Sequence, residues 1–327
     1  MDFHVVPGRA ITEILSAERH AVLKVVRETY LMHGRGETVN PESCFLRFPD
    51  RPADRGIALP AYLAGADRQM GIKWISSFPG NLAAGLPRAT AVLILNDAAT
   101  GYPVACLEGA QISAARTAAS AAVATAALTR GSDPRRLAFV GTGVIARNIL
   151  EYLDVASFPV SAVTCFDLDA SRAQAFAAHA EAITGTPASM AARIEDALDS
   201  DVVVFATTAA TPHLGRNAQL RPGQLVLNIS LRDLAPELLL RASNVLDDVD
   251  HCLRAGTSPH LAEQVSGGRT FVSGTLADVL AGKVEPDPGL PVIFSPFGLG
   301  VLDVAVGSLV LAEAKRLGTA QLINDFF

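Results

Sequence analysis

A glycine-rich turn in the middle of the chain constrains the fold more than any other feature of the sequence. The apolar run Arg136–Val140 leads into Gly141-Thr-Gly143, and a helical pattern containing Ala146 follows. In a G-x-G-x-x-A turn of this kind, the first glycine permits the sharp bend and the second lets the backbone approach a pyrophosphate. The small third residue allows close packing of helix and strand, and the helix N-terminus adds N–H groups and partial positive charge.

A carboxylate at the end of the next strand completes a dinucleotide-binding pattern. Asp167 ends the strand expected at Ala162–Asp167, where it would accept hydrogen bonds from the adenosine ribose hydroxyls. It would also repel a 2′-phosphate, and Leu168 rather than arginine follows it, so the pattern favours NAD over NADP. The alternative is a simple strand–helix turn with a capping aspartate that binds no nucleotide.

Strand and helix patterns alternate after the glycine turn. The further strand patterns are Val202–Thr207, Gln224–Ile229 and Asn244–Asp247, and the helical patterns are Gly141–Asp154, Ala170–Ile183 and Ala191–Leu198. This alternation predicts a Rossmann-type, doubly wound parallel sheet with helices on both faces. Such a unit is complete by about Pro296.

The N-terminal part has a different pattern. An amphipathic helix is expected over Ile11–Tyr30. Short strands separated by Pro and Gly turns then indicate a largely antiparallel sheet. They are expected at Cys44–Phe48, Gly56–Leu63, Met70–Ser76 and Thr90–Asn96, with a turn over Asp97–Pro103. An Ala-rich helix should run from an N-cap at Ser113 to Thr129, and a final apolar helix spans Leu299–Leu317.

The chain of 327 residues is too long for one typical core and predicts two domains. Because the final helix follows a complete α/β unit, we expect it to return to the first domain. The predicted class is therefore α/β, with a Rossmann-type domain inserted into a discontinuous α+β domain. Residues 1–116 plus 304–327 are assigned to substrate binding and dimerisation, and residues 117–303 to NAD binding.

Composition narrows the classes of partner. Half of the residues are hydrophobic and 18% are charged, which is typical of a globular chain, and the net charge of -6 gives no attraction to nucleic acid or anionic membranes. The four cysteines are scattered without metal-ligand spacing, so we expect reduced thiols and no metal. With no signal pattern and no long apolar run, the expectation is a cytoplasmic protein that acts on a small molecule.

Three polar features have the character of an active site. Lys73 stands in an apolar strand, where loss of solvation would lower its pKa, although it could instead extend to the surface. Arg116-Thr117, placed in the first turn of the Ala-rich helix, suits a carboxylate or phosphate, although Arg116 could form an ion pair at a domain hinge. Asp233 follows a buried strand and would face the nicotinamide, although it could simply cap the helix at Pro236.

Together these blocks resemble the ornithine cyclodeaminase and mu-crystallin family over nearly the whole chain. The matching blocks are Gly71-Ile-Lys73-Trp through Pro79-Gly-Asn81, Ser113-Ala-Ala-Arg116-Thr117-Ala-Ala, Gly141-Thr-Gly143, Asn228 to Asp233, and Ser295-Pro-Phe-Gly298-Leu-Gly300-Val-Leu-Asp303. The resemblance implies a homodimer in which a nucleotide domain is inserted into the substrate domain. It also implies that Arg47, Lys73 and Arg116 hold the substrate α-carboxylate, that Asp233 activates water or handles the amino group, and that Thr117 contacts cofactor phosphate.

Within the family, the chain is more similar to the dehydrogenases that cleave N-(2-amino-2-carboxyethyl)-L-glutamate. The blocks that carry this are Gly71-Ile-Lys73-Trp-Ile-Ser, Asn228 to Glu237 and Asp247 to Arg254, and the Gly-Gly-Asp-Cys-Pro-Gly-Lys type of loop found in the cyclodeaminases is missing. The implied reaction transfers hydride from the glutamate Cα to NAD and hydrolyses the imine to 2-oxoglutarate and 2,3-diaminopropionate, a precursor of siderophores and peptide antibiotics.

The expected site residues follow from the residues and the resemblance together. Lys73 and Asp233 are expected to be catalytic. The expected substrate contacts are Arg47, Lys73, Asn81, Arg88, Arg116 and Arg232, with Arg254 as a further candidate. The expected NAD contacts are Thr117, Gly141, Thr142, Gly143, Val144, Ile145, Asp167, Thr207, Ser230 and Gly298. The alternatives are an ornithine cyclodeaminase, a related amino or imino acid dehydrogenase, and a binding protein without catalysis, like mu-crystallin.

Overall fold

The structure is a computed structural model that describes residues 2–65 and 68–327. The chain divides into two compact units, Met1–Arg116 with Leu299–Phe327, and Thr117–Gly298. The chain thus returns to the first unit at Leu299, five residues before the expected position 304. The reason is that the side chain of Asp303 bonds to Lys73 and Arg116, both in the first unit.

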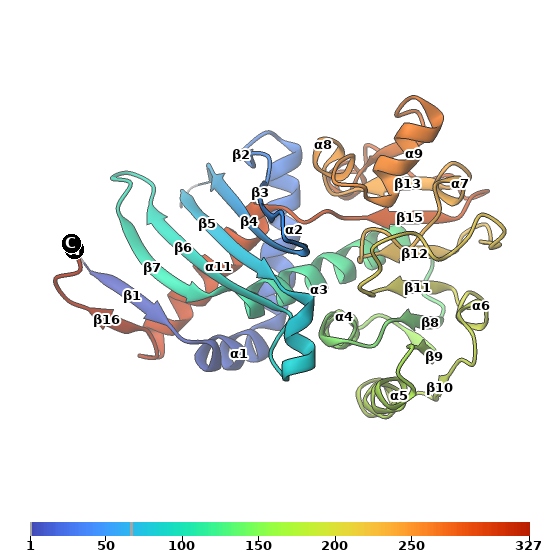
Figure 1. Cartoon of the computed structure of the whole chain (residues 1–327), viewed down its shortest axis with the longest axis horizontal. Coiled ribbons are helices and arrows are strands. Elements are labelled where there is room, and N and C mark those ends of the chain that lie inside the picture. Colours follow the sequence, from blue (N-terminus) through green and yellow to red (C-terminus); the bar gives the residue numbers. More distant parts are fainter. Residues whose placement is uncertain (1, 66–67) are drawn as a thin grey trace. The chain divides into compact units, whose positions relative to one another are not determined.

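The first unit is built on a mostly antiparallel sheet (Figure 1). Its strand order is β16-β1-β7-β6-β5-β4-β2, and β3 also pairs with β4. The strands are β1 Phe3–Val6, β2 Thr38–Val39, β3 Cys44–Phe48, β4 Arg51–Leu63, β5 Gln69–Ser77, β6 Ala89–Asp97, β7 Pro103–Glu108 and β16 Gln321–Ile323. The four expected strands are present, whereas β1, β2, β7 and β16 were not predicted.

The single helix expected over Ile11–Tyr30 is wrong, because two helices occupy this region. They are α1 Gly8–Ala17 and α2 Arg19–Gly34. Between them Glu18 leaves helical geometry, with φ -105° and ψ 24°, while its N–H still bonds to Ile14 O. The apolar positions keep helical spacing across Glu18, so periodicity alone gave no sign of the break. The short helix η1, Pro79–Ala84, follows β5.

Helix α11, Gly300–Arg316, packs closely on the sheet of the first unit (Figure 1). A Cβ atom at Gly307 would lie 2.1 Å from Leu93 Cδ2, and one at Gly300 would lie 3.1 Å from Leu59 O. A larger residue at either position would force Leu93 or the β4 backbone to shift, so the two glycines favour this close approach of helix to strands. The close packing brings Asp303, in the first turn of α11, down onto β5.

Helix α3, Gly109–Leu128, begins earlier than expected. The N-cap expected at Ser113 is wrong, because the Glu108 carboxylate accepts from Ala110 N (2.7 Å) and Gln111 N (3.0 Å) and so caps the helix five residues earlier. Arg116 consequently lies in the second turn, away from the free N–H groups. The expected pairing of this arginine with a helix N-terminus is therefore also wrong.

The second unit contains an eight-stranded parallel sheet of order β10-β9-β8-β11-β12-β15-β13-β14. Its strands are β8 Arg135–Val140, β9 Val160–Phe166, β10 Ala188–Met190, β11 Val202–Phe205, β12 Leu225–Asn228, β13 Ser243–Leu246, β14 Val272–Thr275 and β15 Val292–Ser295. The predicted α/β class with a doubly wound parallel sheet is confirmed. Strands β10, β14 and β15 were not predicted.

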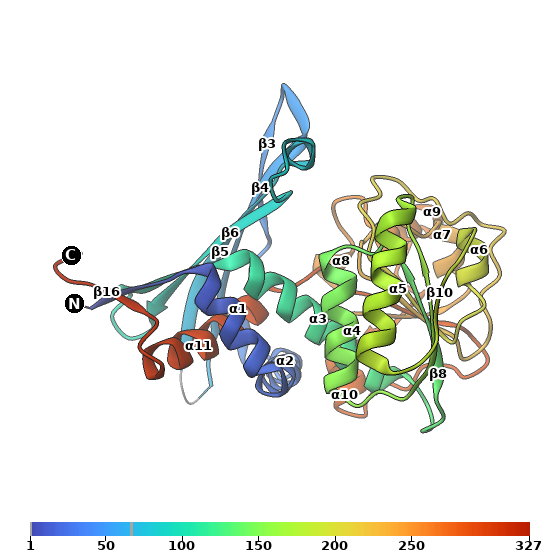
Figure 2. The same ribbon diagram turned by 90° about the horizontal axis from the view of Figure 1, so that it is seen from below.

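Helices cover the parallel sheet of the second unit. They are α4 Val144–Val155, α5 Ala170–Thr184, α6 Ile194–Ala197, α7 Pro236–Leu239, α8 Val249–Cys252, α9 Ser258–Ser266 and α10 Leu276–Leu280. Figure 2 shows α4 and α5 side by side along the sheet. The helix expected over Ala191–Leu198 is correct only for α6, because residues 191–193 form a short connection from β10 and Arg193 is the N-cap of α6.

Candidate active site

Three charged side chains form a buried cluster in the first unit. Lys73, on β5, is 2% exposed, and its Nζ lies 2.6 Å from Asp303 Oδ2. The second oxygen, Asp303 Oδ1, accepts from Arg116 Nε at 3.0 Å. Ser113 Oγ accepts from Lys73 Nζ at 3.0 Å. Strand β5 and helices α3 and α11 thus each supply one charged group.

The cluster holds two cations and one carboxylate. Burial disfavours a charged amine, and this desolvation lowers the pKa of Lys73 from 10.5 to about 8, although the nearby Asp303 raises it and Arg116 lowers it further. A buried excess of positive charge is costly unless an anion joins it. The cluster therefore has the electrostatic character of a carboxylate-binding site.

The structure distinguishes between the alternatives stated for Lys73 and Arg116. Lys73 does not extend to the surface, because its side chain is buried. Arg116 forms an ion pair with Asp303, but both residues belong to the first unit, so it is not the hinge ion pair that was the alternative. The sequence analysis named Asp303 only as the last residue of a matching block and did not predict it as a site residue. Its position inside an otherwise apolar helix could have marked it as a site residue, just as the apolar strand around Lys73 marked that lysine.

The other substrate residues expected in this unit lie apart from the cluster. Arg47 is exposed on β3, with its guanidinium carbon 5.2 Å from the Phe45 ring centre. Arg88 donates to Ser77 Oγ at 3.1 Å, and Asn81 donates to Pro87 O at 3.1 Å. Within residues 2–65 and 68–327, no hydrogen bond or ion pair joins these three side chains to Asp303.

The glycine turn of the second unit fits a dinucleotide. Gly141 has φ +84°, and a Cβ atom there would lie 2.7 Å from Ala206 O, so the position requires glycine. A Cβ atom at Gly143 would meet nothing within 4 Å, which leaves open space beside the backbone. Gly143 is also the N-cap of α4 and no side chain caps the helix there. The N–H groups of Val144 and Ile145 in its first turn are thus suited to bind a phosphate.

Asp167 follows β9 and lies beside this turn. Its Oδ2 accepts from both the N–H and the hydroxyl of Thr142, each at 2.8 Å, and its Oδ1 accepts from Asp169 N at 3.0 Å. Burial opposes ionisation, but these hydrogen bonds and Arg172 outweigh it, and the pKa of Asp167 is lowered. The carboxylate is therefore fixed in its charged form next to the Gly141-Thr-Gly143 turn, where ribose hydroxyls could donate to it.

Asp233 is the centre of a second buried network. It is fully buried, and its Oδ1 lies 2.5 Å from Thr207 Oγ1 and 2.7 Å from His213 Nε2. Its Oδ2 accepts from the Ser230 hydroxyl. Helix α7 has Ala235 as its N-cap, so Asp233 is not the capping residue.

Thr207 and Ser230, which were expected to contact NAD, here donate to Asp233. His213 was missed in the sequence, although it stands just after a strand of the nucleotide domain.

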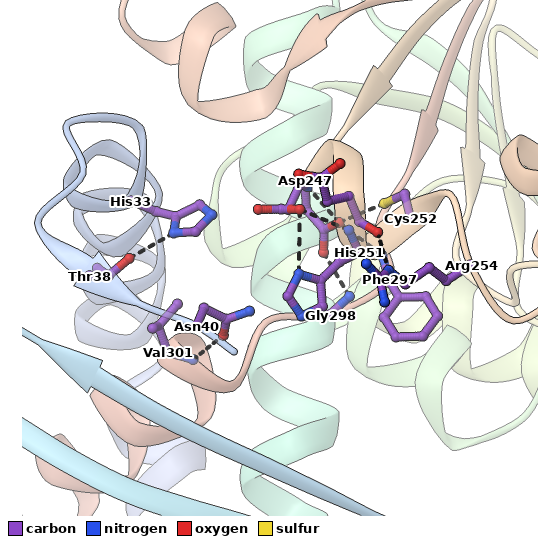
Figure 3. A network of polar contacts seen from close by, with 12 residues as sticks. His33, Thr38, Asn40, Asp247, His251, Cys252, Arg254, Phe297, Gly298 and Val301 are labelled. Atoms are coloured by element: carbon purple, nitrogen blue, oxygen red, sulfur yellow. Dashed lines mark hydrogen bonds and ion pairs between the residues drawn. The ribbon is translucent and has the colours of Figure 1, made fainter. Parts of the chain in front are cut away.

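A third buried carboxylate, Asp247, holds the loop that follows β15 (Figure 3). Its Oδ1 accepts from Phe297 N at 3.0 Å and from the Cys252 thiol at 2.9 Å, and its Oδ2 accepts from Gly298 N at 2.7 Å. Burial raises the pKa of Cys252 well above its usual value, so this thiol is not a nucleophile. The N–H of Gly298, an expected NAD contact, is already bonded to Asp247.

The remaining expected residues have local roles. Arg232 donates to Ala255 O at 2.6 Å, and Thr117 is half-buried on α3. Among the described residues, no cluster of His, Cys, Asp or Glu has the arrangement of a metal site. Across the same residues, no helix combines the length and the apolar character needed to cross a bilayer.

Comparisons with known proteins cover nearly the whole chain. The ornithine cyclodeaminase/mu-crystallin family model matches residues 13–317. An alanine dehydrogenase of Archaeoglobus fulgidus is 28% identical, with 93% of each protein covered. An N-((2S)-2-amino-2-carboxyethyl)-L-glutamate dehydrogenase of Staphylococcus aureus is 25% identical, covering 96% of this chain and 92% of that protein. The solved structure of an archaeal alanine dehydrogenase dimer with bound NAD is 26% identical, covers all of both chains and has a TM-score of 0.88.

Proposed function

Because the chain belongs to the ornithine cyclodeaminase/mu-crystallin family, we propose that it catalyses the NAD-dependent oxidative cleavage of N-(2-amino-2-carboxyethyl)-L-glutamate. The products would be 2,3-diaminopropionate and 2-oxoglutarate, for siderophore or peptide biosynthesis. At the coarser level the chain is an NAD-dependent oxidoreductase of amino or imino acids, a class that also includes its alanine dehydrogenase relative. The finer substrate rests on its likeness to the staphylococcal enzyme.

The observation that carries the proposal is the excess positive charge of the Lys73–Arg116–Asp303 cluster. A substrate carboxylate placed there would accept from Arg116 and Lys73 while Asp303 keeps both cations in position. Binding of the anion would also favour the protonated form of Lys73, whose pKa is about 8 in the free protein. The cluster thereby recognises an α-amino acid and fixes the orientation of its Cα.

The second unit would supply the cofactor site and the proton chemistry. Gly141, Gly143 and Asp167 would hold NAD, which accepts the hydride from the substrate Cα. Loss of the amine proton then leaves a carbon–nitrogen double bond, and water adds to its carbon. The network around the buried Asp233, which includes the partly exposed His213, could support this hydrolysis.

The exposed face of the first sheet supports a homodimer. Trp74 and Val92 pair in register on neighbouring strands and are 39% and 41% exposed. Side chains alternate along a strand, so Trp74 lies on the face opposite to Lys73 and α11. A second copy of the chain would cover these apolar side chains, and the archaeal relative is a dimer. Trp74→Glu should then yield monomers in sedimentation experiments, whereas a dimer that persists would place the interface elsewhere.

The test of function is to incubate the purified protein with NAD and candidate amines while following reduced nicotinamide and identifying the keto acid. The proposal expects net NADH and 2-oxoglutarate from N-(2-amino-2-carboxyethyl)-L-glutamate. A cyclodeaminase would instead regenerate its NAD and release ammonia and proline from ornithine, and an alanine dehydrogenase would yield pyruvate from alanine. Tight binding without turnover of any amino acid would indicate a binding protein. Lys283→Ala, at an exposed lysine, is the matched control for Lys73→Ala.

A further inference from the structure

The ring of His213 is held against Asp233 by both backbone and side chain. His213 N and Leu214 N both donate to Asp233 O, at 3.0 and 2.9 Å, so the segment after β11 is tied to the loop after β12. The ring nitrogen Nε2 then lies 2.7 Å from Asp233 Oδ1. The same backbone contacts that fix the segment thus bring the ring onto the carboxylate.

Asp233 itself is poorly placed to contact water or substrate. The residue is fully buried, and both of its oxygens already accept hydrogen bonds from the side chains of Thr207, His213 and Ser230. A carboxylate with these donors is held in one orientation. Its negative charge is therefore available mainly to the group in contact with it that can take up and release a proton.

His213 is that group. Its side chain is 37% exposed, while Asp233 is fully buried. Phe205 packs near the imidazole, with ring centres 6.3 Å apart, and Asp233 is the charged group that the described structure places against it. With Nε2 directed at Asp233, the other nitrogen, Nδ1, makes no hydrogen bond to any residue of the described part of the chain. A carboxylate that orients an imidazole in this way stabilises its protonated form when it takes up a proton.

We propose that His213 is the acid–base residue of the hydrolytic half-reaction and that Asp233 is a positioning residue that acts through it. This inference rests on the proposed function, since it assigns the proton transfers of imine hydrolysis. The oxygen of water bonds to the imine carbon while Nδ1 of His213 takes the proton of that water. The imidazolium passes that proton to the imine nitrogen, which gives a carbinolamine. His213 then takes the hydroxyl proton of the carbinolamine and delivers it to the same nitrogen as the carbon–nitrogen bond breaks, which releases the keto acid and the amine.

The first test compares His213→Gln, Asp233→Asn and the double variant. His213→Gln should lower kcat by about 100- to 10,000-fold, the usual contribution of an acid–base group, with NAD binding unchanged. Adding Asp233→Asn to His213→Gln should cost little more, because Asp233 acts through the imidazole. If the losses in kcat of the two single variants multiply in the double variant, then Asp233 contacts the reacting water itself, and the proposal is overturned.

A second test separates chemistry from folding. Imidazole added to His213→Ala should restore part of kcat, since the side chain is accessible and a small base can replace it. A failure of rescue, together with a parental fold, would contradict the assignment. The matched control is His179→Gln, which removes an imidazole 3.4 Å from Glu151 on the helices α4 and α5. This variant should keep parental kcat.

The third test needs no substrate. Nitrogen NMR of the His213 ring in the parent protein should show Nε2 protonated toward Asp233 and Nδ1 as the open nitrogen. The opposite tautomer would refute the geometry. If the parent oxidises a different amino acid to a keto acid, the proposed substrate fails, but the same variants assayed on that amino acid still test His213, because formation of the keto acid requires hydrolysis of the imine.

Discussion

Asp303→Asn is the substitution that examines the buried cluster most directly. The amide keeps the size of the carboxylate but removes the negative charge that bonds Lys73 at 2.6 Å and Arg116 at 3.0 Å. One amide oxygen can accept from only one of the two cations in the same geometry, while the amide NH2 faces the other. The variant should therefore lack the anion that Lys73 and Arg116 share.

The expected cost can be worked out group by group. Arg116 cannot lose its proton, so it forfeits a charge-assisted hydrogen bond worth about 1.5–3 kcal/mol. In the variant, Lys73 can lose its proton, which costs about 1.4 kcal/mol for each unit between pH 7.5 and its ordinary pKa of 10.5, or about 4 kcal/mol. Burial of Lys73 already costs the parent protein about 3 kcal/mol, because it lowers the pKa to about 8, so Lys73 adds only about 1 kcal/mol in the variant. The total destabilisation should therefore be about 3 kcal/mol.

The assay uses the single tryptophan of the chain. Trp74 neighbours Lys73 on β5, so its fluorescence during urea unfolding reports on the first unit. Asp303→Asn should unfold at lower urea, whereas Glu13→Gln, which breaks an exposed ion pair with Arg9, should not. Ionisation of Lys73 should also produce a step near pH 8 in the pH profile of kcat/KM. In Asp303→Asn this step should move below pH 8, since Asp303 no longer raises the pKa of Lys73. Parental stability together with an unmoved limb would refute this account of the cluster.

Three further outcomes are expected. Lys73→Ala should abolish turnover with NAD affinity nearly intact, and a near-normal rate would remove this lysine from the mechanism. Asp167→Ala should weaken NAD binding by calorimetry far more than substrate binding, and equal losses would mean that the ribose contact is misplaced. Between pH 8 and 10.5 the unfolded chain holds a proton that folded Lys73 has lost, so the free energy of unfolding should rise with pH by up to about 3 kcal/mol. Lys73→Met should remove that rise in urea melts, and an identical rise in both proteins would exclude Lys73 as its source.

The sequence predicted those helices and strands that are determined by neighbouring residues in the chain. The strands β3 to β6 of the first sheet, the strand–turn–helix at Gly141 and the return of the final helix all follow from periodicity and turn residues. Strands β10 and β14 were not predicted, because Ala-Ser-Met and Val-Ser-Gly-Thr carry no continuous apolar run. Strand β15 was missed although it is as apolar as the equally short β11 and β12. The start of α3 was misplaced because Glu108, outside the expected helix, caps it.

The site residues also fall into those that the sequence could predict and those that only the structure revealed. Lys73, Arg116 and Asp233 were identifiable because a charged residue in or beside an apolar segment needs a partner. The partner itself could not be inferred, since Asp303 lies 230 positions beyond Lys73 in the sequence. His213 could not be ranked above other histidines until the backbone bonds to Asp233 placed its ring.

By itself, the amino-acid sequence determined the kind of chain: a glycine turn with its carboxylate, an alternating parallel unit and a buried lysine that required an anion. Tertiary structure alone decided which groups meet. Burial makes each unpaired charge costly, and only the packing of α11 against β5 shows that one carboxylate serves both Lys73 and Arg116 and leaves the cluster with a positive charge.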